Sequence, residues 1–241
     1  MKHRKKVILT TLTVTAALFI FLAPARAQQS GLVLSRVEGP RLMITWKTNT
    51  YVPSWFTGKA LPTANSPITA SVELIDNGTR VDLSGQQVYW YVNSEFTAGG
   101  VGLRKISFNA PSVAQNTIDL RVELPSYGSD QANPVLKTIE IPVVVPEAVI
   151  ESPFPRGRFS STSIGFKGWP FFFNVGKSSQ LNFSWSVNGQ SSQNLESPES
   201  LTVTLNSDAP SGSPVNVNFT AGIPGSITEV ANAGVNLIFV K

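Results

Sequence analysis

The sequence predicts an all-β protein: two tandem β-sandwiches that follow an N-terminal export signal. Three observations support this prediction. Apolar and polar side chains alternate along much of the chain, turn-forming residues separate the alternating segments, and one order of strands and turns occurs twice. Successive side chains of a β-strand point to opposite faces, so such alternation indicates strands with one buried face. No long segment shows a convincing helical period.

The clearest strand covers residues 118–124, where four apolar side chains share one face and three charged side chains share the other. The same alternation recurs in residues 139–145, 181–187, 201–205 and 215–219. One face of each strand is therefore expected in a core and the other in water.

Turn signals lie between these strands: Asp76-Asn77-Gly78, Gly99-Gly100, Asn188-Gly189 and the segment 209–212. Asn-Gly and Asp-Asn-Gly sequences favour tight hairpins because Asn and Gly accept the left-handed backbone conformation that such turns need. A calcium loop would need more regularly spaced oxygen ligands than residues 76–78 offer. We therefore interpret these residues as a hairpin turn.

An internal repeat divides the chain. Trp90-Tyr91-Val92-Asn93 recurs 95 residues later as Trp185-Ser186-Val187-Asn188, and each copy is followed by a strand, an Ala-Pro turn and another strand. A period near 100 residues is the usual size of an immunoglobulin-like sandwich. We expect one sandwich over residues 28–145 and a second over residues 146–241, joined by a short proline-flanked connection.

Trp90 and Trp185 take the place of the core tryptophan of such a fold, without the flanking cysteines of antibody domains. The chain thus resembles the broad immunoglobulin-like superfamily of bacterial surface and periplasmic proteins. More narrowly, residues 68–75, the strand around Trp90 and residues 139–150 look similar to uncharacterised exported proteins of candidate-phylum bacteria. The resemblance implies a fold and an exported location, and it carries no known binding residue.

Residues 1–27 have the pattern of a signal peptide: a basic start, an apolar run over residues 7–23, and Ala25-Arg26-Ala27 for a signal peptidase. Cleavage would leave Gln28 first. The alternative is an uncleaved membrane anchor, because the apolar run lies at the lower length limit for spanning a bilayer. In both cases the remainder is predicted to be periplasmic, on the cell surface or extracellular.

Composition excludes several functions. Five of the 19 basic residues and no acidic residue precede residue 28, so 14 basic residues face 15 acidic ones afterwards, for a net charge of −1. Nucleic-acid binding through bulk charge therefore has no support. The chain has no cysteine, and its one histidine is His3. Thiol nucleophiles, His-based triads and His/Cys zinc sites are thus absent after the signal.

No catalytic, cofactor-binding or metal-binding residue is predicted. The sequence lacks a nucleophile elbow and a phosphate-binding loop, and its paired acids lie beside turns or linkers. A Ser–Lys dyad or a carboxylate pair assembled only in three dimensions stays open.

Two groups of aromatic residues are the candidate binding sites. One lies in a Pro/Thr/Gly-rich stretch without a strand pattern, which is long for a connection; the other lies near three basic residues. Exposed aromatic faces beside polar groups suit sugar rings or a protein segment, whereas the alternative is that these rings fill a core or the joint between the sandwiches. The candidate residues are Tyr51, Trp55, Phe56, Trp169, Phe172, Arg156 and Arg158.

The sequence favours a non-enzymatic exported module that binds or spaces surface components, with a protein or surface polymer as partner. Contact with a membrane is expected only through an uncleaved N-terminal segment. The first alternative is a membrane-anchored accessory of a pilus or secretion assembly, and a further one is a polymer-acting hydrolase. Replacing Trp55 or Trp169 by alanine is expected to abolish binding and leave the fold intact. If either substitution unfolds the protein, that aromatic residue belongs to a core.

Overall fold

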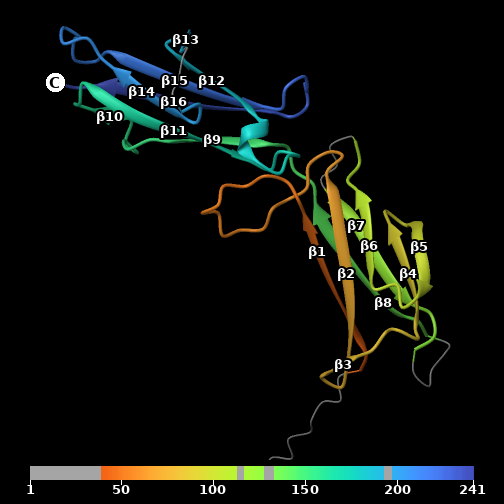
Figure 1. Cartoon of the computed structure of the whole chain (residues 1–241). Helices are drawn as coiled ribbons and strands as arrows, with labels where there is room; N and C mark the ends of the chain where they lie inside the picture. The colour runs from red at the N-terminus through yellow and green to blue at the C-terminus, as the bar shows by residue number, and fades with distance from the viewer. Residues whose placement is uncertain (1–38, 113–116, 128–132, 193–196) are drawn as a thin grey trace, which may run out of the picture. The chain divides into compact units, whose positions relative to one another are not determined.

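The computed structural model describes residues 39–112, 117–127, 133–192 and 197–241. The expected signal peptide, residues 1–27, lies outside the described residues. Those described belong to one compact unit, Val37–Lys241, and form sixteen strands and one short 3-10 helix, η1 (Ser178–Gln180) (Figure 1). No helix in this part of the chain is long and apolar enough to cross a membrane.

The first sandwich consists of two sheets. In one, β2 pairs with β1, β3 and β6; in the other, the strand order is β5-β4-β7-β8. All pairings in both sheets are antiparallel. The strands are β1 (Arg41–Thr48), β2 (Pro67–Asp76), β3 (Thr79–Val81), β4 (Gln87–Val92), β5 (Glu95–Val101), β6 (Lys105–Asn109), β7 (Thr117–Leu124) and β8 (Val135–Pro142).

The second sandwich pairs a sheet of order β14-β11-β9 with a sheet of order β10-β16-β15-β12-β13. Only β10, which lies beside β16, runs parallel to its neighbour among these strands. The strands are β9 (Glu147–Glu151), β10 (Arg158–Phe159), β11 (Ser163–Phe171), β12 (Asn182–Val187), β13 (Gln190–Ser192), β14 (Ser200–Thr204), β15 (Pro214–Gly222) and β16 (Val230–Phe239).

Apart from β3 in the first sandwich and β10 in the second, both sandwiches have the same strand order, which is that of an immunoglobulin-like domain. In the A-to-G nomenclature, β1-β2-β6 and β9-β11-β14 are A-B-E, and β5-β4-β7-β8 and β13-β12-β15-β16 are C′-C-F-G. The predicted fold, all-β with two tandem immunoglobulin-like sandwiches, is confirmed. The boundary at residues 145 and 146 stays a prediction.

The repeated tryptophans have the same role in each core. Trp90 on β4 and Trp185 on β12 are both almost fully buried. Each donates its indole N–H to a backbone carbonyl thirteen residues further on, Trp90 to Leu103 at 2.8 Å and Trp185 to Pro198 at 3.0 Å. Because a buried indole N–H needs an acceptor, this carbonyl fixes the orientation of the ring.

The repeated asparagines also correspond. Asn93 and Asn188 both have a φ of 49° and turn the chain back after the tryptophan strand. The Asn93 side-chain oxygen accepts the N–H of Asp119 at 3.0 Å, and that of Asn188 accepts the N–H of Asn216 at 2.8 Å. The predicted hairpin at residues 188–189 is therefore confirmed.

One predicted turn is wrong. Gly99 and Gly100 lie within β5 and pair with Tyr89 and Val88 of β4. A Cβ on Gly99 would lie 2.5 Å from a ring carbon of Tyr89. The glycine is thus present because the tyrosine ring covers the backbone of the neighbouring strand, and not because the chain turns there.

Candidate functional site

The long segment between β1 and β2, residues 49–66, is a loop whose base is held by backbone carbonyls. The Thr50 hydroxyl donates to the carbonyl of Leu61 at 2.7 Å, which ties the two sides of the loop together. The Val144 N–H donates to the carbonyl of Pro62 at 2.9 Å and attaches the loop to the segment that follows β8. These contacts satisfy polar groups that the loop buries.

The other side of this loop contacts the end of β11 through an isolated bridge. The Tyr51 N–H donates to the Phe173 carbonyl at 2.8 Å, and the Phe172 N–H donates to the Tyr51 carbonyl at 2.7 Å. Phe172 has a φ of 62°, a left-handed conformation that is strained for a bulky residue, by about 1–3 kcal/mol. The strained backbone interrupts strand alternation, so three successive phenylalanines are all buried.

These phenylalanines face two different surroundings. Phe173 belongs to the second core, whereas Phe171 and Phe172 contact Phe56 of the loop, with ring centroids 5.5 and 6.1 Å away. Both contacts are edge-to-face, the geometry that aromatic rings prefer. Phe171 and Phe172 thus lie outside the second core, and the loop covers them.

Trp55 and Trp169 are the exposed portion of this aromatic cluster. Their ring centroids are 5.1 Å apart with an interplanar angle of 80°, and 53% of Trp55 remains exposed. Trp169 donates its indole N–H to a carboxylate oxygen of Glu151 at 2.8 Å. The Lys167 ammonium lies 4.1 Å from the centroid of the Trp169 ring, within the range of a cation–π interaction.

An apolar depression of about 500 Å³ lies at this cluster, lined by Trp55, Val149, Glu151 and Trp169. The strand register explains it: Trp169 of β11 pairs with Val149 of β9, and Lys167 pairs with Glu151. Paired residues of adjacent strands point to the same face. The outer face of the sheet therefore carries the apolar side chains of Trp169 and Val149 beside the charged side chains of Glu151 and Lys167.

The structure brings the two predicted aromatic groups together. Of their members, Trp55 and Trp169 border the depression, whereas Phe172 is 7% exposed and Tyr51 packs against the second core. Phe56, half-buried, covers Phe171 and Phe172.

The two predicted arginines lie elsewhere. Arg158 is on β10, which pairs with β16 in the opposite sheet, and Arg156 lies in the turn just before it. Both are exposed, and neither lines the depression at Trp55.

Glu151 and Val149 were not predicted as site residues. In the sequence, Glu151 is one of several acids beside a linker. Its importance depends on the pairing of β9 with β11, which places its carboxylate next to the Trp169 indole. The alternation of Glu147, Val149 and Glu151 on one face is the signal that could have identified it.

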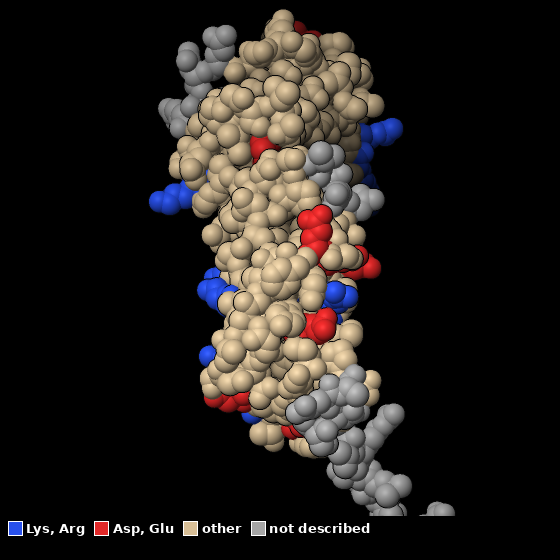
Figure 2. All heavy atoms as spheres, turned by 90° about the vertical axis from the view of Figure 1, so that its right-hand side faces the viewer, with Lys and Arg blue, Asp and Glu red and all other residues tan. Residues whose placement is uncertain are grey.

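Charge and metal-ligating groups are sparse. On the face shown in Figure 2, basic and acidic side chains are scattered and form no large patch of one sign. Within the described ranges, no three His, Asp or Glu residues gather as a metal ion would require. The depression at Trp55 offers apolar side chains and the Glu151 carboxylate, which suit apolar contact and hydrogen bonds.

The fold defines the class of tandem immunoglobulin-like proteins, and this chain carries an exposed aromatic cluster at Trp55 and Trp169. No family model and no curated protein matches the chain. Among solved structures, it is similar to three N-terminal domains of the bacteriophage RB49 highly immunogenic outer capsid protein, at 12% identity and a TM-score of 0.44. That match covers 83% of this chain and 59% of the phage chain, so the chain spans less than two thirds of it.

Two further structures are similar at a lower level. Fibronectin(III)-like modules of Clostridium thermocellum CbhA match at 11% identity and a TM-score of 0.27, over 82% of this chain and 94% of theirs. A Bacteroides ovatus glucan-utilisation protein in complex with a mixed-linkage heptasaccharide matches at 10% identity and a TM-score of 0.22, over 85% and 48%. Similarity this low transfers no ligand or partner to this chain.

Proposed function

We propose that the chain is a non-enzymatic exported module of the cell envelope or surface, which holds a protein or surface polymer through Trp55 and Trp169. The observation that carries this proposal is that Trp55 remains 53% exposed although neighbouring aromatic rings fix it in place. Large aromatic side chains with little freedom are typical anchors of binding surfaces, since ordering them on binding costs little entropy.

The surroundings of Trp55 support a binding role over a packing role. Its ring meets Trp169 and Phe171 edge-on, with interplanar angles of 80° and 82°. The depression beside it leaves space for a ligand. The Glu151 carboxylate fixes the Trp169 indole, so the site exists before a partner arrives.

The test is retention of the purified protein, residues 28–241, on isolated cell envelopes. We expect Trp55→Ala to reduce retention at least tenfold, because it removes the exposed anchor. Phe96→Ala is the matched control, since Phe96 is 61% exposed but lies on β5 of the first sandwich. Both variants should keep the unfolding transition of the parent.

Two outcomes contradict the proposal. If Trp55→Ala is retained as well as the parent, the site does not bind the envelope. If the substitution unfolds the protein, Trp55 is a packing residue and the assignment fails.

A further inference from the structure

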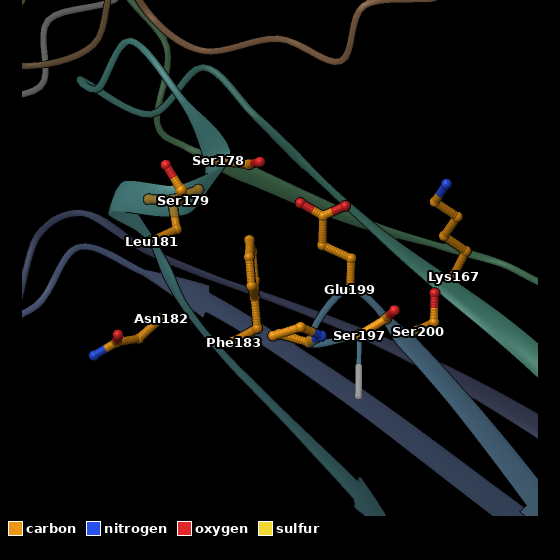
Figure 3. Close-up of a pocket in the computed structure, with 10 residues that line it drawn as sticks. Lys167, Ser178, Ser179, Leu181, Asn182, Phe183, Ser197, Glu199 and Ser200 are labelled. Carbon is orange, nitrogen blue, oxygen red and sulfur yellow. The ribbon is translucent and has the colours of Figure 1, made fainter. Parts of the chain in front are cut away.

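The Trp55 depression is one end of a longer track on the second sandwich. A groove of about 890 Å³ lies at the start of β14, and the residues that line it include Lys167, Ser178, Ser179, Phe183, Glu199 and Ser200 (Figure 3). A hollow of about 320 Å³ shares Lys167 with this groove and Glu151 with the Trp55 depression. The three spaces are therefore neighbours, linked through the paired residues Lys167 of β11 and Glu151 of β9.

The groove combines one aromatic ring with many small hydrogen-bonding groups. Figure 3 shows the Phe183 ring and the Glu199 side chain in the groove, with Ser178 and Ser179 on one side and Lys167 on the other. Phe183 stacks on the buried Phe219, with ring planes inclined by 19°, so its position is fixed. Hydroxyl, amide and carboxylate groups around an apolar floor suit a ligand that carries both apolar faces and many hydroxyl groups.

Lys167 occupies the middle of the track. Strand pairing places it between Ser200 of β14 and Glu151 of β9. Its ammonium lies over the Trp169 ring, so the side chain connects the polar groove with the aromatic end. A ligand that reaches from Glu199 to Trp55 must pass this residue.

The charge of the track argues against a polyanion. Two carboxylates, Glu151 and Glu199, line it together with one ammonium, that of Lys167. A strongly anionic polymer would be repelled by a net negative surface. Neutral hydroxyl groups, in contrast, form strong hydrogen bonds with charged acceptors and donors.

The direction of the track argues against an extended peptide. A peptide that adds to a sheet runs along an edge strand and pairs with its backbone. This track crosses from β14 over the central strand β11 to β9, so it runs across the strands, whereas an added peptide strand would lie along β14 or β9, the two edge strands. A ligand that follows the track therefore meets mainly side chains.

We propose that this track binds a neutral oligosaccharide, with one sugar ring stacked on Trp55 and further units in the hollow and at Phe183 and Glu199. This inference rests on the proposed binding function of Trp55 and names its ligand class. The apolar face of a sugar ring packs on an aromatic ring, while its hydroxyl groups meet the surrounding polar side chains.

The experiment measures binding of cellohexaose, maltohexaose, mannohexaose and chitohexaose to residues 28–241 by calorimetry. Binding of polygalacturonate, an anionic polysaccharide, is measured for comparison with the neutral sugars. We expect at least one hexasaccharide to bind, and the disaccharide of the same sugar to bind at least tenfold more weakly because it cannot span the track. Trp55→Ala should weaken binding at least tenfold and the isosteric Glu199→Gln severalfold, whereas Phe96→Ala should change nothing.

A second arm uses envelopes treated with periodate, which cleaves vicinal diols of sugars, or with a protease. Loss of retention after periodate alone supports the inference. Retention that survives periodate but not protease shows a protein partner and overturns it, as does equally tight binding of polygalacturonate or failure of every hexasaccharide to bind. If Trp55→Ala still lowers retention in those cases, the proposed function stands and only the sugar assignment fails.

Discussion

At the scale of single residues, the buried tryptophans combine packing with one required hydrogen bond. Trp185 packs on Phe219, with ring centroids 4.6 Å apart, and its N–H reaches the Pro198 carbonyl. Folding removes water from this partly buried carbonyl. If the carbonyl then has no hydrogen-bond donor, the free energy of its desolvation is not offset, and the folded state is destabilised. The effect of a substitution here therefore depends on the polar atom as well as on ring volume.

Trp185→Phe should lower the free energy of unfolding by about 1–3 kcal/mol, because the Pro198 carbonyl loses its donor and the smaller ring leaves space. Urea unfolding followed by circular dichroism measures the change. Trp55→Phe, at an exposed ring, is the control and should change stability by less than about 0.5 kcal/mol. Equal effects of both substitutions would contradict the assigned core role.

A second residue-scale prediction concerns Glu229, a buried acid just before β16. Burial raises the pKa of its carboxyl, and the hydrogen bond from the Asn174 N–H at 3.1 Å opposes that change. A raised pKa means that the folded chain holds the proton more tightly than the unfolded chain. The resulting stability is fully present below the unfolded pKa of about 4.3 and is lost as pH rises through the folded pKa.

Glu229→Gln stays neutral and keeps an acceptor for Asn174. We therefore expect this variant to be more stable than the parent at pH 7 and to lose that advantage below about pH 4. Thermal unfolding across this pH range tests the sign, with the exposed Glu140→Gln as control. A variant that is less stable at pH 7 would show that the ionised carboxylate stabilises the fold.

At the scale of elements, the two repeats share a turn whose asparagine performs two functions. Asn188 adopts a left-handed backbone, and its side-chain oxygen accepts the N–H of Asn216 on β15, the strand that pairs with β12. Asn93 does the same in the first sandwich. The recurrence of Trp-x-Val-Asn in the sequence thus reflects one strand-turn unit with fixed contacts.

Asn188→Ala should lower the free energy of unfolding by about 2–3 kcal/mol, since alanine is strained at this φ and cannot accept the Asn216 N–H. Asn188→Gly removes only the side-chain hydrogen bonds, the one from Asn216 and a longer one to the Pro214 carbonyl at 3.4 Å, so its cost should be about 1 kcal/mol. Denaturant unfolding of both variants separates the two contributions. Alanine and glycine variants of equal stability would show that backbone strain is unimportant here.

At the scale of the whole molecule, two hydrophobic cores stabilise the chain. Buried members of the first core lie between Leu42 and Val143, and those of the second between Phe159 and Phe239. Among the described residues that precede β9, only Tyr51 packs against the second core. Each core therefore consists almost entirely of residues from one copy of the repeat.

Residues 146–241 should consequently fold when expressed alone, with a cooperative unfolding transition and a tryptophan emission that shifts when the buried Trp185 is exposed on unfolding. Phe171 and Phe172 would lose the cover of Phe56, so we expect lower solubility than for residues 28–241. Fluorescence and dispersion of amide signals in nuclear magnetic resonance test this. An unfolded product would show that the loop over residues 49–66 is part of the second core and would contradict the predicted boundary.

The sequence by itself determined the all-β class, the repeat and its core tryptophans, because strand alternation and turn chemistry are local properties. It also identified both aromatic groups. It did not show that Trp55 meets Trp169 or that Glu151 holds the Trp169 indole, since these contacts depend on strand register and on a long loop. Only the tertiary structure decided which rings are buried. Strand alternation would place successive side chains on opposite faces, but Phe172 has a positive φ and residues 49–66 pack over Phe171 and Phe172, so three successive phenylalanines are buried.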